Sequence, residues 1–448
     1  MNDLALWLSS QWGKVSTTSS LKDYTQSKTV NLLAYAGILL LSVASLSNAL
    51  RFAPSNSDDL RILSSVIKTS NPLAYFFSDW GLGGTSMYRP LHSVGIWLSF
   101  HAFGMFPAFD QLINLLLHTV VICLTYRIIR KSGSGPGISL LVSALAIASP
   151  YTLSPATWIS DRPTLIVALF MMILINYLYS DPQSQKTPQG WLVSLICIGG
   201  LMGKESGLIL PIFVALRGFI SDSPKNTKIR NILLGLGIAG IYSIFRLIIF
   251  GQQAAVYSES GYILGLFHYS TLSQLPSLIK NWAYADNFIK NIFSIVLPVF
   301  DWEGGFHSPR VLFDTLPLWL ATFFLVALTT TRKLSPLQKA AIMLIALNSL
   351  VHVAIFRYRI QYISFLALCL YVGSSGIFEV SSVRKRLSIA CALCLLVTNL
   401  TIAKRDIVAI SISRRNLINR QAIAQLVQKY PNISNDVVEL LIAKYKLQ

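Results

Sequence analysis

Long apolar runs dominate this sequence and limit the folds it can adopt. A bilayer-spanning helix needs about 20 mostly apolar residues, and only helices and closed barrels satisfy their backbone hydrogen bonds inside lipid. The sequence therefore predicts an all-α polytopic membrane protein with about 11 transmembrane helices, within a range of 10–13. The apolar runs lie near residues 30–50, 110–129, 138–157, 163–180, 191–203, 206–220, 231–250, 311–330, 340–356, 361–379 and 388–403.

The composition excludes several other classes of protein. Of the 448 residues, 53% are hydrophobic and only 12% are charged, about half the charged fraction of a soluble domain. This excludes an ordinary cytosolic enzyme, a disordered protein and a nucleic-acid-binding protein. The formal net charge of +18 is typical of basic residues that collect in cytoplasmic loops and near anionic lipids. The histidines and cysteines have no metal-ligand spacing, so we expect no metal and no cofactor.

Basic residues in the connections predict the orientation of the chain. Clusters of Lys and Arg lie at 127–131, 225–230, 332–339 and 384–386, and the positive-inside rule makes these four connections cytoplasmic. The connections between them then face the opposite side of the membrane. Every unusual polar motif of the sequence falls in that second set, so the sequence predicts a functional site on the extracytoplasmic face.

The same pattern predicts five regions along the chain. A cytoplasmic N-terminal segment (1–29) precedes a transmembrane module (30–250) with a first outer loop of juxtamembrane helices (51–107). An outer loop region (251–310), the C-terminal transmembrane helices (311–403) and a basic amphipathic tail (404–448) follow. We expect residues 91–106 to form a juxtamembrane or re-entrant helix that ends near Gly104 and Pro107. With eleven crossings, the basic tail would lie on the extracytoplasmic side, against the positive-inside rule. A further crossing near 288–300 would place the tail in the cytoplasm, so the side on which the tail lies stays open.

Asp58 and Asp59 form the first candidate site, in the outer loop beyond the first apolar run. In one interpretation Ser57 or Asp58 caps a short helix that starts at Leu60, and the other aspartate is solvated. In the other they are catalytic, because a carboxylate at a membrane surface suits a general base for an acceptor hydroxyl. A neighbouring like charge raises one pKa towards neutrality, which helps such a base. Which aspartate is the base stays open.

Arg89 is the first of five cations that are candidates for binding a phosphate. Pro90 follows it and biases it to an extended conformation just before a helix. An arginine there can clamp a phosphate with two parallel hydrogen bonds, or it can snorkel to lipid phosphates. Tyr88 and His92 flank Arg89 and are supporting candidates.

Two further charged pairs interrupt the apolar runs. Asp161 and Arg162 precede Pro163 at the start of a run, as part of the site or as a local ion pair. Lys204 and Glu205 stand between about 12 and about 15 apolar residues, at or near membrane depth. Charges there are functional by default, although these two could simply neutralise each other.

Arg357 and Arg359 lie at the outer end of a predicted span, close to Tyr362. Two arginines on the outer side contradict the positive-inside rule unless an anion is held there. Carboxylates together with fixed cations suit a site that binds a membrane-embedded phosphate and deprotonates a hydroxyl. The residues predicted on this face are Asp58, Asp59, Arg89, Arg162, Lys204, Arg357 and Arg359, supported by Tyr88, His92, Asp161, Glu205 and Tyr362.

The order of these motifs resembles that of the GT-C glycosyltransferases. Within them it is most similar to the protein O-mannosyltransferase group, especially the transmembrane and TPR-containing O-mannosyltransferases and their bacterial relatives. The DWG…YRPL string and the spacing of Asn114 and His118 are its most specific parts, and the resemblance covers residues 50–215 and 350–365, about half the chain. The matching strings are the Asp58–Asp59 pair, SDWG (78–81), YRPL (88–91), FDQLINLLLH (109–118), WISDR (158–162), KES (204–206) and FRYRIQY (356–362).

The resemblance implies an enzyme with a GT-C type bundle that takes a sugar from a polyprenyl-phosphate donor on the extracytoplasmic face. It implies that Asp58 and Asp59 bind or deprotonate the acceptor, that the anomeric carbon is inverted, and that the lipid phosphate leaves. Arg89, Arg162, Lys204 and Arg359 match positions that steady this phosphate. Members of this branch generally need no metal.

The chain departs from the eukaryotic members because it has no TPR array. About 45 residues follow the last apolar run, too few for a stable repeat array. The compact size suits a bacterial inner-membrane enzyme with its active site facing the periplasm. Such an enzyme would use an undecaprenyl-phosphate sugar, with a surface glycan, glycolipid or protein as acceptor.

Two other functions share part of this pattern. A transporter or flippase for lipid-linked glycans would place charges at mid-membrane and show symmetry between its halves. A glycan polymerase or ligase that uses diphosphate-linked donors would share the outer arginines but would not need the aspartate pair. Replacing Asp58 and Asp59 by Asn separates these functions, because a transferase loses turnover and a flippase does not.

Overall fold

The computed structural model describes most of the chain, and every regular element in the described part is helical. This confirms the all-α class. The described residues are 18–51, 58–80, 87–104, 107–179, 189–220, 224–250, 282–296, 321–322, 324–329, 334–352, 361–375 and 383–417.

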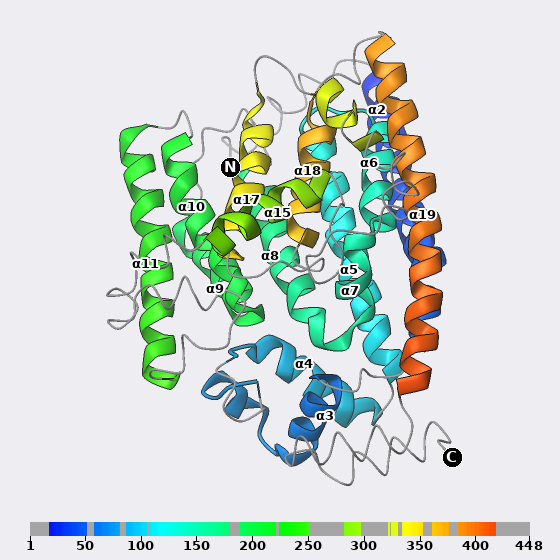
Figure 1. The fold of residues 1–448 in the computed structure, drawn as a ribbon. Helices are drawn as coiled ribbons and strands as arrows, with labels where there is room; N and C mark the ends of the chain where they lie inside the picture. Colours follow the sequence, from blue (N-terminus) through cyan, green and yellow to red (C-terminus); the bar gives the residue numbers. More distant parts are fainter. Residues whose placement is uncertain are drawn as a thin grey trace.

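Most helices stand side by side in one bundle (Figure 1). Among the described residues, four helices are long and apolar enough to cross a membrane, at Lys28–Leu46, Ala108–Lys131, Ile159–Leu178 and Lys225–Phe250, and four shorter apolar helices accompany them. This supports a membrane protein, while the eleven crossings and their orientation stay predictions. The bundle helices are α2 (Thr18–Leu46), α5 (Pro107–Lys131), α6 (Pro136–Ala148), α8 (Arg162–Leu178), α9 (Gly190–Gly203), α10 (Ile209–Ile220), α11 (Lys225–Phe250), α17 (Pro336–Val351), α18 (Gln361–Gly373) and α19 (Val383–Leu417).

The burial of these helices separates the centre of the bundle from its rim. In α8, 78% of the most apolar window is buried, whereas in α11 only 17% is buried. The exposed part of α11 carries large apolar side chains such as Leu233, Ile241 and Ile248. In water such a surface would be unfavourable, but against lipid tails it is the expected outer face of a bundle.

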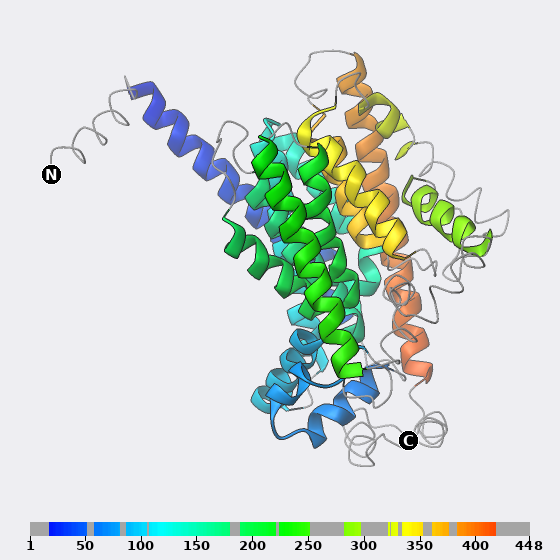
Figure 2. The ribbon, with the colours of Figure 1, turned by 90° about the vertical axis from the view of Figure 1, so that its left-hand side faces the viewer.

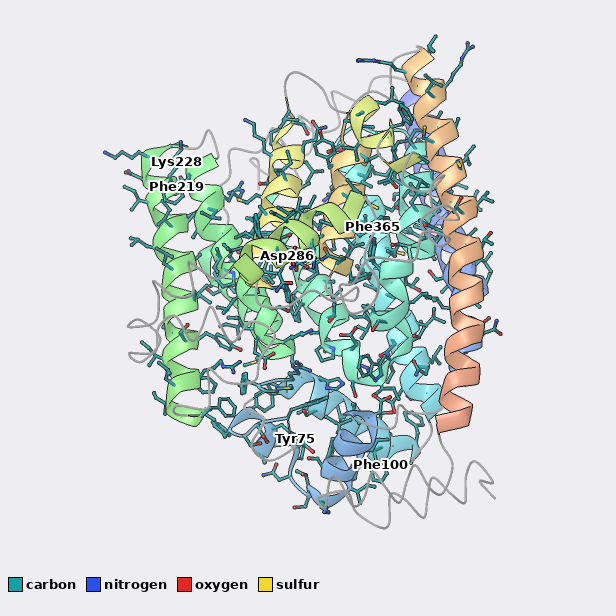
Figure 3. The ribbon with its side chains drawn as sticks, in the orientation of Figure 1. Tyr75, Phe100, Phe219, Lys228, Asp286 and Phe365 are labelled. Atoms are coloured by element: carbon teal, nitrogen blue, oxygen red, sulfur yellow. The ribbon has the colours of Figure 1, made fainter. Side chains whose placement is uncertain are left out.

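A layer of short helices covers one end of the bundle, the lower end in Figures 1 and 2. It consists of α3 (Asp58–Lys68), η2 (Pro72–Phe76) and α4 (Pro90–Phe103), and Tyr75 and Phe100 mark it in Figure 3. Its own apolar cluster includes Ile62, Trp80 and Ile96. We call this end of the molecule the α3–α4 end. It confirms the predicted helix in the first loop, which ends before Gly104, a residue with φ of 65°.

The predicted crossing at 138–157 is not one continuous helix. Helix α6 ends at Ala148, and η3 (Pro150–Thr152), α7 (Leu153–Thr157) and η4 (Ile159–Asp161) follow before α8 begins. Pro150 and Pro155 lack the backbone N–H that a continuous helix needs, which explains the break. The broken segment carries residues 158–162 to the α3–α4 end, where they contact α3, α4 and α5.

Three more boundaries differ from those predicted. Helix α2 begins at Thr18, inside the predicted polar segment, and α19 continues without a Gly or Pro to Leu417. A helix, α15 (Trp282–Val296), lies within the predicted outer loop and packs against α17 and α18. It exposes Asp286, labelled in Figure 3, and buries Asn291, as an amphipathic helix does. Most of the predicted run at 311–330 lies outside the described residues.

Candidate functional site

The turn formed by residues 158–162 is the hub of the α3–α4 end. Asn114 of α5 donates a hydrogen bond from Nδ2 to the carbonyl of Trp158 (3.2 Å), and His92 of α4 donates from Nε2 to the carbonyl of Ile159 (3.0 Å). Asp59 of α3 accepts from the backbone N–H of Ser160 (2.8 Å) and from its hydroxyl. Three helices from different parts of the sequence therefore hold one turn in place.

Asp59 is fully buried by these contacts. One predicted alternative was that Asp58 caps the helix and Asp59 is solvated. That alternative is wrong, because Asp59 is buried and its Oδ1 accepts hydrogen bonds from Ser160. Asp58 is the first residue of α3, and its side chain lies outside the described residues. The two aspartates therefore have different settings, and Asp59 connects α3 to the hub.

Arg162 and Asp161 do not form the local ion pair that the sequence left open. The Nη2 atom of Arg162 lies 2.8 Å from Asp110 Oδ1, and its Nε donates to Asn114 Oδ1 (2.6 Å). The two carboxylate oxygens of Asp161 instead accept hydrogen bonds from the hydroxyls of Thr164 (2.8 Å) and Ser154 (2.9 Å). Because its oxygens are committed to these hydroxyls, Asp161 shapes the turn, and Arg162 ties the turn to α5.

Glu205 is paired with two arginines rather than with the adjacent Lys204. Its carboxylate lies 3.5 Å from Arg89 Nε and 3.4 Å from Arg246 Nη1, and it accepts a hydrogen bond from the backbone N–H of Tyr88 (2.8 Å). All three charged side chains are at most 7% exposed. Burial alone would raise the pKa of Glu205, but the two guanidinium groups and its hydrogen bonds hold that pKa below its ordinary value.

Lys204 extends the same network towards the hub. Its Nζ lies 3.4 Å from the hydroxyl of Thr164, the residue that also bonds to Asp161. Hydrogen bonds therefore lead from the hub through Thr164 to Lys204, and the next residue in the chain is Glu205. The structure thus brings Asp59, Arg89, Arg162 and Lys204 together at one end of the bundle, as the sequence predicts.

His92 and Tyr88 support the site without carrying charge. Trp80 Nε1 donates to His92 Nδ1 (2.7 Å), so this imidazole carries its proton on Nε2. Burial, followed by the nearby charges of Arg162 and Arg89, holds the pKa of His92 well below its ordinary value. Burial raises the pKa of Tyr88 to about 12. Both side chains are therefore neutral packing and hydrogen-bonding groups around Arg89, whose guanidinium lies 5.0 Å from the Trp80 ring centre.

A polar stripe on α5 connects the site to the interior of the bundle. Asp110, Asn114 and His118 are spaced four residues apart, so they share one face of the helix, and all three are buried. His118 Nδ1 lies 2.8 Å from the hydroxyl of Tyr362 on α18. Tyr362, one of the supporting candidates, therefore contacts α5. Arg357 and Arg359, which precede it, lie outside the described residues.

A small apolar cavity of about 40 Å³, partly open to its surroundings, lies among the helices of the bundle. Its walls come from α6, η3, α15, α18, α19 and the residues Thr322, Leu325 and Val326, and they include Tyr151, Phe365, Cys369 and Asn399. Phe365 is labelled in Figure 3. Tyr362, Phe365 and Cys369 are spaced three and four residues apart, so the cavity borders the same face of α18 that carries Tyr362.

Two charged residues of the site were missed by the sequence interpretation. Arg246 is an arginine inside the apolar run of α11, and this position alone would have marked it, because charges inside membrane spans are rare. Asp110, the partner of Arg162, stands in the first turn of α5. Its partner could not be read from the sequence, because 52 residues separate the two.

The described residues contain no group of three or more His, Cys, Asp or Glu side chains that could hold a metal ion. No protein-family model matches this sequence, and no curated protein sequence matches it significantly.

Proposed function

We propose that this chain is a membrane glycosyltransferase that moves a sugar from a polyprenyl-phosphate donor to a hydroxyl acceptor. One observation carries the proposal: Arg89 and Arg246 share the single carboxylate of Glu205 in a nearly water-free place. The guanidinium groups of two arginines therefore lie close to one carboxylate, and closely spaced guanidinium groups suit the binding of phosphate oxygens by charge-assisted hydrogen bonds. We infer that a phosphate monoester or diester anion binds beside this pair of arginines.

The acceptor side of the reaction needs a base close to this cation cluster. We assign the base to Asp58, because Asp59 Oδ1 already accepts two hydrogen bonds from Ser160. These hydrogen bonds stabilise the ionised form of Asp59 and make it a weaker proton acceptor. Asp59 then acts as a positioning residue that ties the start of α3 to the hub.

The reaction proceeds in one displacement. Asp58 takes the proton of the acceptor hydroxyl while the acceptor oxygen forms a bond to the anomeric carbon. The bond between that carbon and the phosphate oxygen breaks, its electrons stay on the polyprenyl phosphate, and the configuration is inverted. Arg89 and Arg246 stabilise the charge that develops on the phosphate, which is the expected main contribution of fixed cations. Lys204 and Arg162 hold the geometry of the neighbouring turn.

The setting of the enzyme follows from the charge pattern and the resemblance. We place the α3–α4 end on the extracytoplasmic face of a bacterial inner membrane, with a surface glycan, glycolipid or protein as acceptor. Undecaprenyl phosphate is the corresponding lipid carrier.

A transfer assay tests the proposal. Purified protein in lipid is given a radiolabelled polyprenyl-phosphate sugar and a membrane-extract acceptor, and transfer is compared between wild type and variants. We expect Asp58→Asn and Arg246→Gln to abolish or strongly reduce transfer. Asp286→Asn serves as the matched control, because it removes an exposed carboxylate whose ion pair with Lys290 lies on α15.

The Asp59–Ser160 contact gives the assay a second test. Ser160→Ala and Asp59→Asn should each slow transfer, and the double variant should be no slower than Asp59→Asn alone, because both remove the same contact. The ionisation seen in the acid limb of the pH–rate profile should persist in Ser160→Ala, since Asp58 is intact. Transfer unchanged by Asp58→Asn would refute the mechanism. Donor flipping without transfer would favour the transporter.

A further inference from the structure

The two ring nitrogens of the buried His118 have different surroundings. The side chain is 0% exposed and sits near the middle of α5, with Nδ1 bonded to the hydroxyl of Tyr362. Its Nε2 has no hydrogen-bond partner in the described part of the chain. Buried polar atoms are nearly always satisfied, so an exception of this kind calls for a physical reason.

The Tyr362 hydroxyl decides which nitrogen of His118 carries the proton. If the phenol donates to Nδ1, the imidazole proton lies on Nε2, and only this N–H is unsatisfied. In the reverse arrangement, Nδ1–H donates to the phenol oxygen, which leaves both the phenol proton and the Nε2 lone pair without partners. The first arrangement has fewer unsatisfied groups and is favoured. His118 therefore presents a single N–H donor.

Through Tyr362, this donor is connected to the face of α18 that lines the apolar cavity. His118 is one helical turn, about 6 Å, beyond Asn114 on the same face of α5, and Asn114 binds Arg162. On the other side, Tyr362 shares a face of α18 with Phe365 and Cys369, which line the cavity. A ligand at this position would meet charged and polar groups at one end and apolar walls at the other.

We propose that His118 Nε2–H donates a hydrogen bond to a phosphate oxygen of the polyprenyl-phosphate donor, and that the start of its isoprene chain packs against the apolar lining of the cavity. This inference rests on the proposed function. A polyprenyl phosphate matches this arrangement, because its anionic head can meet the polar groups while its long apolar chain lies against the apolar side chains. An anionic oxygen is also the strongest acceptor for an N–H that is shielded from water.

Binding of two matched probes tests the role of His118 separately from turnover. The probes are decaprenyl phosphate and decaprenol, which differ only in the phosphate, and the protein is the full chain in lipid nanodiscs. We expect wild type to bind the phosphate probe more tightly than the alcohol. His118→Phe should weaken binding of decaprenyl phosphate about tenfold or more, the usual effect of removing a hydrogen bond to a charged group. It should leave decaprenol binding within about twofold, because the ring and the cavity walls remain.

Two conservative variants keep the test decisive if His118→Phe folds poorly. His118→Gln retains an N–H donor and should recover part of the phosphate affinity. Tyr362→Phe removes the group that sets the imidazole tautomer, so it should weaken phosphate binding by a smaller factor. His101→Gln changes an exposed histidine of α4 and should bind both probes as wild type does.

The outcomes separate this inference from the proposed function. If Arg89→Gln weakens binding of decaprenyl phosphate while all His118 and Tyr362 variants bind it like wild type, the His118 inference is wrong and the proposed function stands. Equal losses for both probes in the His118 variants would also refute it, because they indicate packing alone. If wild type shows no preference for the phosphate probe and Arg89→Gln has no effect, the proposed function itself fails.

Discussion

Replacing Glu205 by Gln should destabilise the protein far more than replacing Arg246 by Met. In the wild type, Glu205 compensates two buried guanidinium groups, at 3.5 Å from Arg89 and 3.4 Å from Arg246. Glu205→Gln leaves two uncompensated positive charges at a site that is almost completely dry. Arg246→Met leaves the Arg89–Glu205 pair intact, together with the hydrogen bond from Tyr88, and fills the space with an apolar side chain.

The size of the effect follows from this charge count. Removing one partner from a buried ion pair costs about 3–5 kcal/mol, and the lower end applies here because both distances exceed those of an ideal pair. For 448 residues the unfolding entropy is about 0.9 kcal/mol per degree, so 3 kcal/mol corresponds to roughly 3 °C in Tm. For Arg246→Met we expect a change of about 1 °C or less.

Thermal unfolding of the purified protein in detergent, followed by tryptophan fluorescence, measures both changes. The double variant Glu205→Gln/Arg246→Met should be more stable than Glu205→Gln alone, because it has one buried positive charge fewer. Asp286→Asn is the control, since an exposed ion pair contributes little. The reasoning is refuted if Arg246→Met lowers Tm more than Glu205→Gln does, or if the second substitution fails to restore stability.

Two further perturbations test the packing of the site. The folded-state pKa of His92 lies well below 6.5, so below pH 6.5 the unfolded state binds a proton that the folded state does not. The contribution of His92 to the free energy of unfolding should therefore be fully present above pH 6.5 and fall as the pH drops, by up to about 1.4 kcal/mol per pH unit. In measurements of Tm against pH, His92→Gln should flatten this decline, whereas His101→Gln should not. Gly207→Ala would place a Cβ 2.3 Å from the carbonyl oxygen of Gly200, and this clash should lower Tm by about 1–3 °C. The matched control is Gly95→Ala, whose Cβ would meet no atom within 4 Å. This control should have the same Tm as wild type or a higher one. A Gly207→Ala variant as stable as wild type would contradict the close approach of η5 (Glu205–Leu208) to α9.

The apolar runs and the polar interruptions were readable from the sequence because both are local patterns. Each apolar run, apart from 311–330, overlaps helical residues in the described part of the chain. The α4 helix and its end at Gly104 follow from Pro and Gly at fixed positions. The apolar run at 138–157 is divided into three helical segments, because hydrophobicity alone does not record the N–H groups that Pro150 and Pro155 lack.

Pairing partners were decided by the tertiary structure alone. Asp59 and Ser160 are 101 residues apart, and Tyr88 and Glu205 are 117 apart. The sequence suggested that Arg162 pairs with its neighbour Asp161 and that Lys204 pairs with Glu205. In the structure, Arg162 binds Asp110, and Glu205 binds Arg89 and Arg246. A charge pattern shows that a cation needs an anion, but only the packing of helices determines which anion reaches it.

The sequence by itself therefore determined the helical class, the membrane setting and the set of polar residues at one end, because helix period and apolar length act over fewer than about 25 residues. The tertiary structure decided that Asp59 is a buried anchor, that Arg246 belongs to the cation cluster and that His118 Nε2 has no hydrogen-bond partner among the described residues. Those three properties depend on contacts between helices far apart in the chain, and on the exclusion of water that only the packed bundle provides.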